Sequence, residues 1–371
     1  MQPKLRTFRN INRGLRGGQI LRMGLALSAV RDIPITVNKV RAGRKNPGLR
    51  PQHLTGLQIA RDACNGKLEG GQIGSCEVSF YPDHISGGRY MADTQTAGSV
   101  SLLVQSVLPC ALYADSPSCF VLRGGTNAEF APQVDYTIQY LLNINNYFQH
   151  IYFRGFYPMG KGEVTLKVKP SVEGLYAADF TDFGDLVSVY GTAYVSGVLP
   201  IKVAHKMADT AQQLLLEKLP KNVEIYIDRI KEYAERGMGN GSGIVLWAET
   251  TTGCVLGGAA LGKRGRGAEE DGLTAANEIL HSVERRACLD KYAQDQVIIF
   301  MALAKGKSRI RTGPLTDHTK TAMWVAKLLT KVSVIIITIS MPTWVIFILL
   351  YSTYHSKMPV IQVQIIKNSV I

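Results

Sequence analysis

Apolar side chains recur along the chain with two different periods, one typical of helices and the other typical of strands. Ile20, Met23 and Leu27 are spaced three or four residues apart, which predicts a helix that opens at Gly17-Gly18-Gln19. Over residues 33–40 apolar and polar side chains alternate instead, which predicts a strand. The chain therefore begins by combining both kinds of element.

The same order of elements occurs twice in the first half of the chain. A helix that opens at Gln52 and a strand-like stretch at 70–81 complete the first occurrence, over about residues 17–81. Two similar units side by side predict an α/β (α+β) layer fold. The second unit, over about residues 97–169, is expected to hold helices at 100–112 and 133–148, a strand at 120–122, a Gly-rich turn at 124–127 and strands at 151–153 and 163–168.

Residues 187–284 have a different character and are expected to form an inserted smaller α/β domain. A long helix at 202–219 and a strand at 222–227 are predicted there. The Gly-rich stretch 237–243 leads into a strand and not into a helix, so it lacks the geometry that cradles a phosphate.

A third unit begins near Cys288 and ends in an unusual apolar segment. Residues 332–354 carry no formal charge, and a stretch of about 23 residues is long enough to span a bilayer. One interpretation is a C-terminal membrane anchor. The favoured interpretation is an altered tail in place of the last core strands, because Pro342 and β-branched runs suit a regular helix poorly.

Composition adds a basic charge to this picture. The chain has 371 residues, a formal net charge of +13 and 46% hydrophobic residues, which excludes a disordered chain. A polyanionic partner such as nucleic acid or nucleotide explains the charge, and a merely basic soluble protein is the alternative. The six cysteines form no C-x-x-C pair, which excludes a zinc framework and favours a reducing compartment, cytosol or nucleus.

Cations gather in two places. Residues 1–31 hold seven basic residues and no acidic residue before Arg31, which favours a basic arm over a transit leader. The loop 41–53 contains Arg41, Arg44, Lys45 and Arg50 without an acid, and guanidinium groups bind phosphates in a fork. The alternative for this loop is a solvated surface.

One histidine stands out chemically. His318 follows the turn at Gly313-Pro314 and precedes an apolar helical run, among hydroxyl and charged side chains. An imidazole can serve as acid, base, metal ligand or nucleophile near neutral pH. A structural histidine is the alternative.

Several stretches match one family pattern in the same order: Gly17 to Arg22, Arg41-Ala42-Gly43-Arg44, Pro47 to His53, Gly124-Gly125-Thr126-Asn127, Asp295-Gln296 and the segment that contains His318. With these stretches the chain resembles the RNA 3′-terminal phosphate cyclase family over about residues 17–330. The resemblance implies repeated βαβαββ-type units with an inserted α/β domain, divided as 1–186 with 285–331, 187–284, and an atypical tail at 332–371. It also implies an ATP-dependent ligase that converts an RNA 3′-phosphate end to a 2′,3′-cyclic phosphate through a histidine–AMP intermediate, with ATP and a divalent metal, Mg²⁺, as cofactors.

The resemblance assigns residues to roles. His318 is implied as the nucleophile toward ATP. The other assigned residues also have structural alternatives. Gln105 could satisfy a buried backbone group, Tyr292 could belong to the core, and Asp295 could be a charge on a helix surface. The ATP site would contain Gln105, Pro132, Tyr292, Asp295 and Gln296, and phosphates or the RNA 3′-phosphate end would be bound by Arg22, Arg41, Arg44, Gln52 and His53; the metal ligands are unknown.

Departures from the family pattern leave two other functions open. A glutamate that opens the first turn in the family is Leu15 here, and a Gly-Gly-Gly is Gly160-Lys161-Gly162. One alternative is a non-catalytic cyclase-like RNA-binding protein of ribosome assembly, and the presence of His318 argues against it. The other alternative is an impaired variant of the enzyme. The expected location is the nucleus (nucleoplasm), with the cytoplasm as the alternative, and a membrane partner through residues 332–354 is not favoured.

Overall fold

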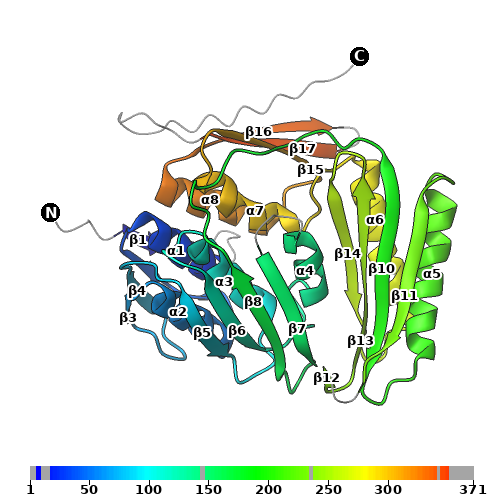
Figure 1. Cartoon of the computed structure of the whole chain (residues 1–371), viewed down its shortest axis with the longest axis horizontal. Helices are drawn as coiled ribbons and strands as arrows, with labels where there is room; N and C mark the ends of the chain where they lie inside the picture. The colour runs from blue at the N-terminus through cyan, green and yellow to red at the C-terminus, as the bar shows by residue number, and fades with distance from the viewer. Residues whose placement is uncertain (1–5, 10–16, 143–146, 234–236, 341–342, 351–371) are drawn as a thin grey trace.

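The structure is a computed structural model that describes residues 6–9, 17–142, 147–233, 237–340 and 343–350. It confirms the α/β fold class: helices cover several separate mixed sheets (Figure 1).

The first repeat has the order βαβαββ. Its sheet has the strand order β1-β2-β4-β3, with β1 parallel to β2 and β4 antiparallel to both β2 and β3. Ile35 and Val37 are two residues apart on β2, so their side chains point to the same face of this sheet. Both are fully buried, as is Phe80 of β4, which shows that this face packs on helices. Its elements are β1 (Arg6–Arg9), α1 (Gly17–Arg31), β2 (Ile35–Asn38), α2 (Pro51–Ala63), β3 (Lys67–Glu69) and β4 (Glu77–Tyr81).

The second repeat has the same order and the same pairing. β5 is parallel to β6, and β8 is antiparallel to both β6 and β7. The helix predicted at 133–148 is shorter: α4 ends at Leu142 and β7 already begins at Tyr147. Asparagine has a low helix propensity, so the sequence at 143, 145 and 146, which holds three asparagines, disfavours a longer helix. The elements are β5 (Gly88–Asp93), α3 (Val100–Ala111), β6 (Ser118–Gly124), α4 (Val134–Leu142), β7 (Tyr147–Gly155) and β8 (Gly162–Val168).

The third repeat is completed by the apolar C-terminal segment. β9 is parallel to β15, and β17 is antiparallel to both β15 and β16, so the hairpin β16–β17 occupies the place of β3–β4 and β7–β8. Figure 1 shows this hairpin over α7 and α8. Phe347 and Leu349 are fully buried there. The elements are β9 (Asp179–Phe180), α7 (Ala293–Leu303), β15 (Lys307–Thr312), α8 (Asp317–Thr330), β16 (Ser333–Ser340) and β17 (Thr343–Leu350).

A smaller unit is inserted between β9 and α7, and we call its elements from β10 to α6 the small unit. Its sheet has the order β11-β10-β13-β14, and its own core contains Met207, Leu246 and Ile279. The elements are β10 (Leu186–Ser196), α5 (Lys202–Lys218), β11 (Glu224–Lys231), β12 (Gly237–Met238), β13 (Gly241–Thr250), β14 (Val255–Leu261) and α6 (Ala268–Glu284), of which β12 pairs with β7 of the second repeat.

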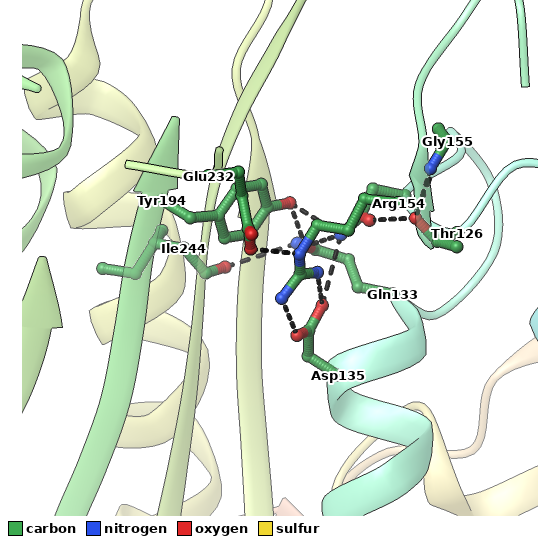
Figure 2. A network of polar contacts seen from close by, with 9 residues as sticks. Thr126, Gln133, Asp135, Arg154, Gly155, Tyr194, Glu232 and Ile244 are labelled. Atoms are coloured by element: carbon green, nitrogen blue, oxygen red, sulfur yellow. Dashed lines mark hydrogen bonds and ion pairs between the residues drawn. The ribbon is translucent and has the colours of Figure 1, made fainter. Parts of the chain in front are cut away.

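A buried polar network joins the small unit to the second repeat (Figure 2). Arg154 donates two hydrogen bonds of 2.7 Å to Asp135 and a third to Glu232. The hydroxyl of Tyr194 lies 2.5 Å from Gln133, whose amide nitrogen donates to the carbonyl of Ile244 at 3.3 Å. Because buried polar groups are costly unless they are all paired, this network fixes one arrangement of the two units.

The membrane anchor, the less favoured interpretation of the apolar segment, has no helix to support it in the described part of the chain. Among the described residues, no helix is long and apolar enough to cross a membrane, and the part of the 332–354 segment that is described forms strands.

Candidate active site

His318 lies in the first turn of α8, on the exposed side of the helix start. The hydroxyl of Thr316 caps this helix by accepting a hydrogen bond of 3.1 Å from the backbone N–H of Thr319. The N-terminus of a helix carries a partial positive charge and unsatisfied N–H groups, which attract anions. The turn thus places an imidazole at a position that favours a phosphate.

A buried glutamine connects His318 to a carboxylate. Nδ1 of His318 lies 2.7 Å from Oε1 of Gln19, and Nε2 of Gln19 donates to Oδ2 of Asp295 at 2.7 Å. An ionised carboxylate only accepts hydrogen bonds, so it orients the amide with its oxygen toward the imidazole. Nδ1 of His318 must then carry the proton, and Nε2 carries the lone pair of the ring.

Burial governs the charge of Asp295. Desolvation raises the pKa of this carboxyl to about 6, and the nearby Arg22 opposes the shift. Asp295 is therefore mostly ionised at neutral pH and can hold Gln19 in the orientation described.

A cleft that encloses about 590 Å³ of space, open solvent included, lies beside Gln19. It lies between α1, α3 and α7, so all three contribute side chains. Its polar lining residues are Gln19, Arg22, Gln105, Asp295 and Gln296, and its apolar lining residues are Met23, Val104, Leu108, Pro109, Val297, Ile299 and Phe300.

Arg22 provides the cleft with a cation that has one unsatisfied nitrogen. Burial lowers the pKa of its guanidinium to about 10, with Asp295 opposing the shift, so it stays charged at neutral pH. Its Nε atom is buried and makes no hydrogen bond in the described part of the chain. Such an atom costs free energy unless a ligand accepts from it. An anionic group such as a phosphate fits this position.

His53 and Gln52 lie at the start of α2 and, together with Arg22, line a second, smaller pocket. Nδ1 of His53 accepts a hydrogen bond of 3.3 Å from the backbone N–H of Arg50, so Nε2 carries its proton. Burial, followed by repulsion from Arg22, Arg41 and Arg50, lowers the pKa of His53 to about 4. His53 is therefore a neutral donor at pH 7.

Gln52 has a structural contact of its own. Its Oε1 atom accepts from the backbone N–H of Ser99 at 3.0 Å, which ties α2 to the start of α3.

The structure does not bring every predicted residue into the cleft. Arg41 holds its own loop by donating to the carbonyls of Asn46 and Gly48, while Arg44 is exposed. Burial, followed by repulsion from Arg50 and Arg44, lowers the pKa of Arg41. These side chains form a cationic loop beside α2 and not a wall of the cleft.

Tyr292 and Pro132 also lie outside the lining of the cleft. The Tyr292 hydroxyl donates to Glu278 at 2.9 Å, and its ring contacts that of Tyr136 edge-on. Gln296 donates to the backbone carbonyl of Tyr292 at 2.6 Å, which connects this tyrosine to the cleft. Pro132 is half-buried in the loop before α4, one turn from Tyr136.

No group of three or more acidic, histidine or cysteine side chains suited to a metal is present within the described ranges. Asp295 is the carboxylate that lines the cleft. Mg²⁺ usually keeps several waters and binds through one or two carboxylates together with substrate phosphates. The residues present therefore fit a metal only where a bound phosphate supplies further ligands.

Gln19 takes part in this arrangement, although the sequence pattern did not single it out as a site residue. It belongs to the Gly17-Gly18-Gln19 helix start, but nothing in its neighbourhood predicts a partner, because His318 is 299 residues away. The indication available in the sequence was a polar glutamine at the start of an apolar helical run. The structure buries this side chain to 5% exposure and pairs its amide.

Known proteins of similar sequence share one family description. A family model described as RNA 3′-terminal phosphate cyclase matches residues 13–336. The chain is 40% identical to an RNA 3′-terminal phosphate cyclase of Drosophila melanogaster, over 85% of this chain and 88% of the relative. It is also 40% identical to the protein of that name from Pyrococcus furiosus, over 84% of this chain and 89% of the relative. The chain belongs to the RNA 3′-terminal phosphate cyclase family.

Proposed function

We propose that this protein is an enzyme that converts RNA 3′-phosphate ends to 2′,3′-cyclic phosphates with the consumption of ATP. The relay from His318 through Gln19 to Asp295 carries the proposal, together with the adjoining cleft, in which Nε of Arg22 lacks a hydrogen-bond partner. Family membership and the curated relatives of that name support the reaction.

In the first step, Nε2 of His318 attacks the α-phosphorus of ATP, and the bond to the pyrophosphate oxygen breaks. The histidine–AMP adduct keeps the proton on Nδ1, so the ring becomes cationic. The amide oxygen of Gln19 accepts a hydrogen bond from that proton, and the amide nitrogen of Gln19 donates to the negatively charged Asp295. Both contacts become stronger as positive charge develops on the ring, which is the differential stabilisation that catalysis requires.

In the second step, an oxygen of the RNA 3′-phosphate attacks the same phosphorus, and His318 leaves with its lone pair restored. The product is a phosphoanhydride between AMP and the RNA end. The neighbouring 2′-hydroxyl then attacks the 3′-phosphorus, loses its proton and expels AMP. Splitting one difficult displacement into several easier ones is the advantage of a covalent intermediate.

The remaining residues bind charge. Arg22, with His53 as a neutral donor beside it, would hold phosphate oxygens, and Arg41 and Arg44 would attract the RNA end from the cationic loop. We further propose that Gln105, Pro132, Tyr292 and Gln296 bind the nucleoside. A bound Mg²⁺ would neutralise phosphate charge. We place the protein in the nucleus, with the cytoplasm as the alternative.

Incubation with ATP labelled on the α-phosphate tests the proposal. The wild-type protein should retain label in an acid-labile, alkali-stable bond, and His318→Ala should retain none. His281, in the last turn of α6, provides the control: His281→Ala should label like the wild type. Labelling of His318→Ala would overturn the mechanism, and RNA binding without any labelling of the wild type would favour the non-catalytic alternative.

A further inference from the structure

The side chain of Gln294 is buried, at 1% exposure, beneath the turn that leads to His318. Its Nε2 atom donates to Oγ1 of Thr312 at 2.7 Å and to the carbonyl of Pro314 at 3.3 Å. Its Oε1 atom accepts from Oγ1 of Thr319 at 2.8 Å and from the backbone N–H of Thr316 at 3.3 Å. A primary amide has two N–H donors and two lone pairs, so Gln294 uses its full capacity on this one turn.

The partners of Gln294 fix which way its amide faces. Oγ1 of Thr312 donates to the carbonyl of Leu289 at 2.9 Å, so this hydroxyl must accept from Gln294. On the other side, the backbone N–H of Thr316 can only donate. Only one orientation of the amide satisfies both groups, and the turn is therefore held in one position relative to α7.

His318 lies inside the segment that Gln294 holds. The four contacts involve residues 312, 314, 316 and 319, so they fasten the chain before and immediately after the histidine. The next residue of α7 is Asp295, which holds the His318 side chain through Gln19. Two consecutive residues of α7 thus fix the backbone and the ring of the same histidine.

We infer that Gln294 is a positioning residue for the reaction: it sets where His318 stands relative to the nucleotide in the cleft. The inference rests on the proposed function, because it names what aligns the proposed nucleophile. Displacement of a reacting atom by about 1 Å can cost about 10²-fold in rate. Loss of this amide should therefore slow the chemical step more than it weakens ATP binding.

Gln294→Met tests the inference, because methionine has a similar length and shape but makes none of the four hydrogen bonds. The rate of adduct formation at saturating ATP should fall by about 10- to 100-fold, while the ATP concentration for half-maximal rate changes by less than about threefold. Thr319→Val, which removes one partner hydroxyl at nearly constant shape, should show a smaller fall, and Thr319→Ser should restore the rate.

Gln133→Met is the matched control for a purely structural effect. Gln133 is also a buried glutamine, at 3% exposure, and its amide is also saturated, with partners in the network of Figure 2. Its loss should lower stability by a comparable amount but leave the rate of the chemical step unchanged in the folded protein. Equal rates for Gln294→Met and the wild type, or an equal loss in Gln133→Met, would overturn the inference.

A second readout separates this inference from the proposed function. NMR spectra of protein labelled with ¹⁵N-histidine report the protonated ring nitrogen of His318, which should be Nδ1 in the wild type. Gln294→Met should give a mixture of tautomers, because the ring moves away from Gln19. If the wild type forms no adduct, the proposed function fails, and an unchanged tautomer in Gln294→Met would then overturn the positioning role as well.

Discussion

Phe347→Ala tests whether the apolar C-terminal hairpin is part of the core that supports His318. Phe347 lies on β17, is completely buried, and belongs to the same core cluster as Ile310 of β15 and Val325 of α8. Truncation of a buried phenylalanine to alanine costs about 3–5 kcal/mol, from lost transfer free energy and the cavity left behind. We therefore expect the free energy of unfolding to fall by about that amount.

Urea unfolding followed by tryptophan fluorescence and by circular dichroism measures this loss. Ile337→Ala on the paired strand β16 is the matched control, because Ile337 is only partly buried and lies outside the core clusters; it should cost about 1 kcal/mol. A loss below about 1 kcal/mol in Phe347→Ala would refute the reasoning, since the hairpin would then be dispensable for the fold. At low denaturant, the folded fraction of Phe347→Ala should still form the adduct.

Three further variants test the site and its surroundings. Gln19→Met should slow adduct formation by about 10- to 100-fold, since a hydrogen bond to a charged group is worth about 1.5–3 kcal/mol; rapid-quench kinetics measure it, and an unchanged rate would exclude the relay. The raised pKa of Asp295, about 6, means that the native state binds its proton more tightly than the unfolded state. The free energy of unfolding should therefore fall by about 2–3 kcal/mol as pH rises from about 4 to about 6. In Asp295→Asn the fall over the same pH range should be smaller by this amount, which urea titrations at several pH values measure. Lys161→Gly should raise the free energy of unfolding by about 0.5–1 kcal/mol, because exposed Lys161 has a φ of 57°, which glycine adopts without strain; a lower midpoint in urea would contradict this.

Local patterns were sufficient for the fold class and for much of the repeat. The helical spacing in α1 and the alternation in β2 depend on neighbours in sequence, and both elements form where the pattern predicts them. The histidine after the turn at Gly313-Pro314 was recognisable for the same reason, because its capped helix start is encoded within a few residues.

The C-terminal segment shows where local pattern fails. Its isoleucine-rich runs are compatible with a membrane span, an aberrant tail or a buried strand pair, since an apolar run carries no information about what it packs against. Only the pairing of β17 with β15, and the burial of Phe347 over α8, make it the closing hairpin of the third repeat.

The sequence by itself determined the repeated α/β elements, the basic charge and the family motifs, because each depends on residue type and short-range spacing. The tertiary structure decided which of those residues act together. Gln19 meets His318 across 299 residues and Asp295 across 276, and the cleft exists only where α1, α3 and α7 converge. Contacts of that range depend on how helices pack, and no periodicity along the chain specifies them.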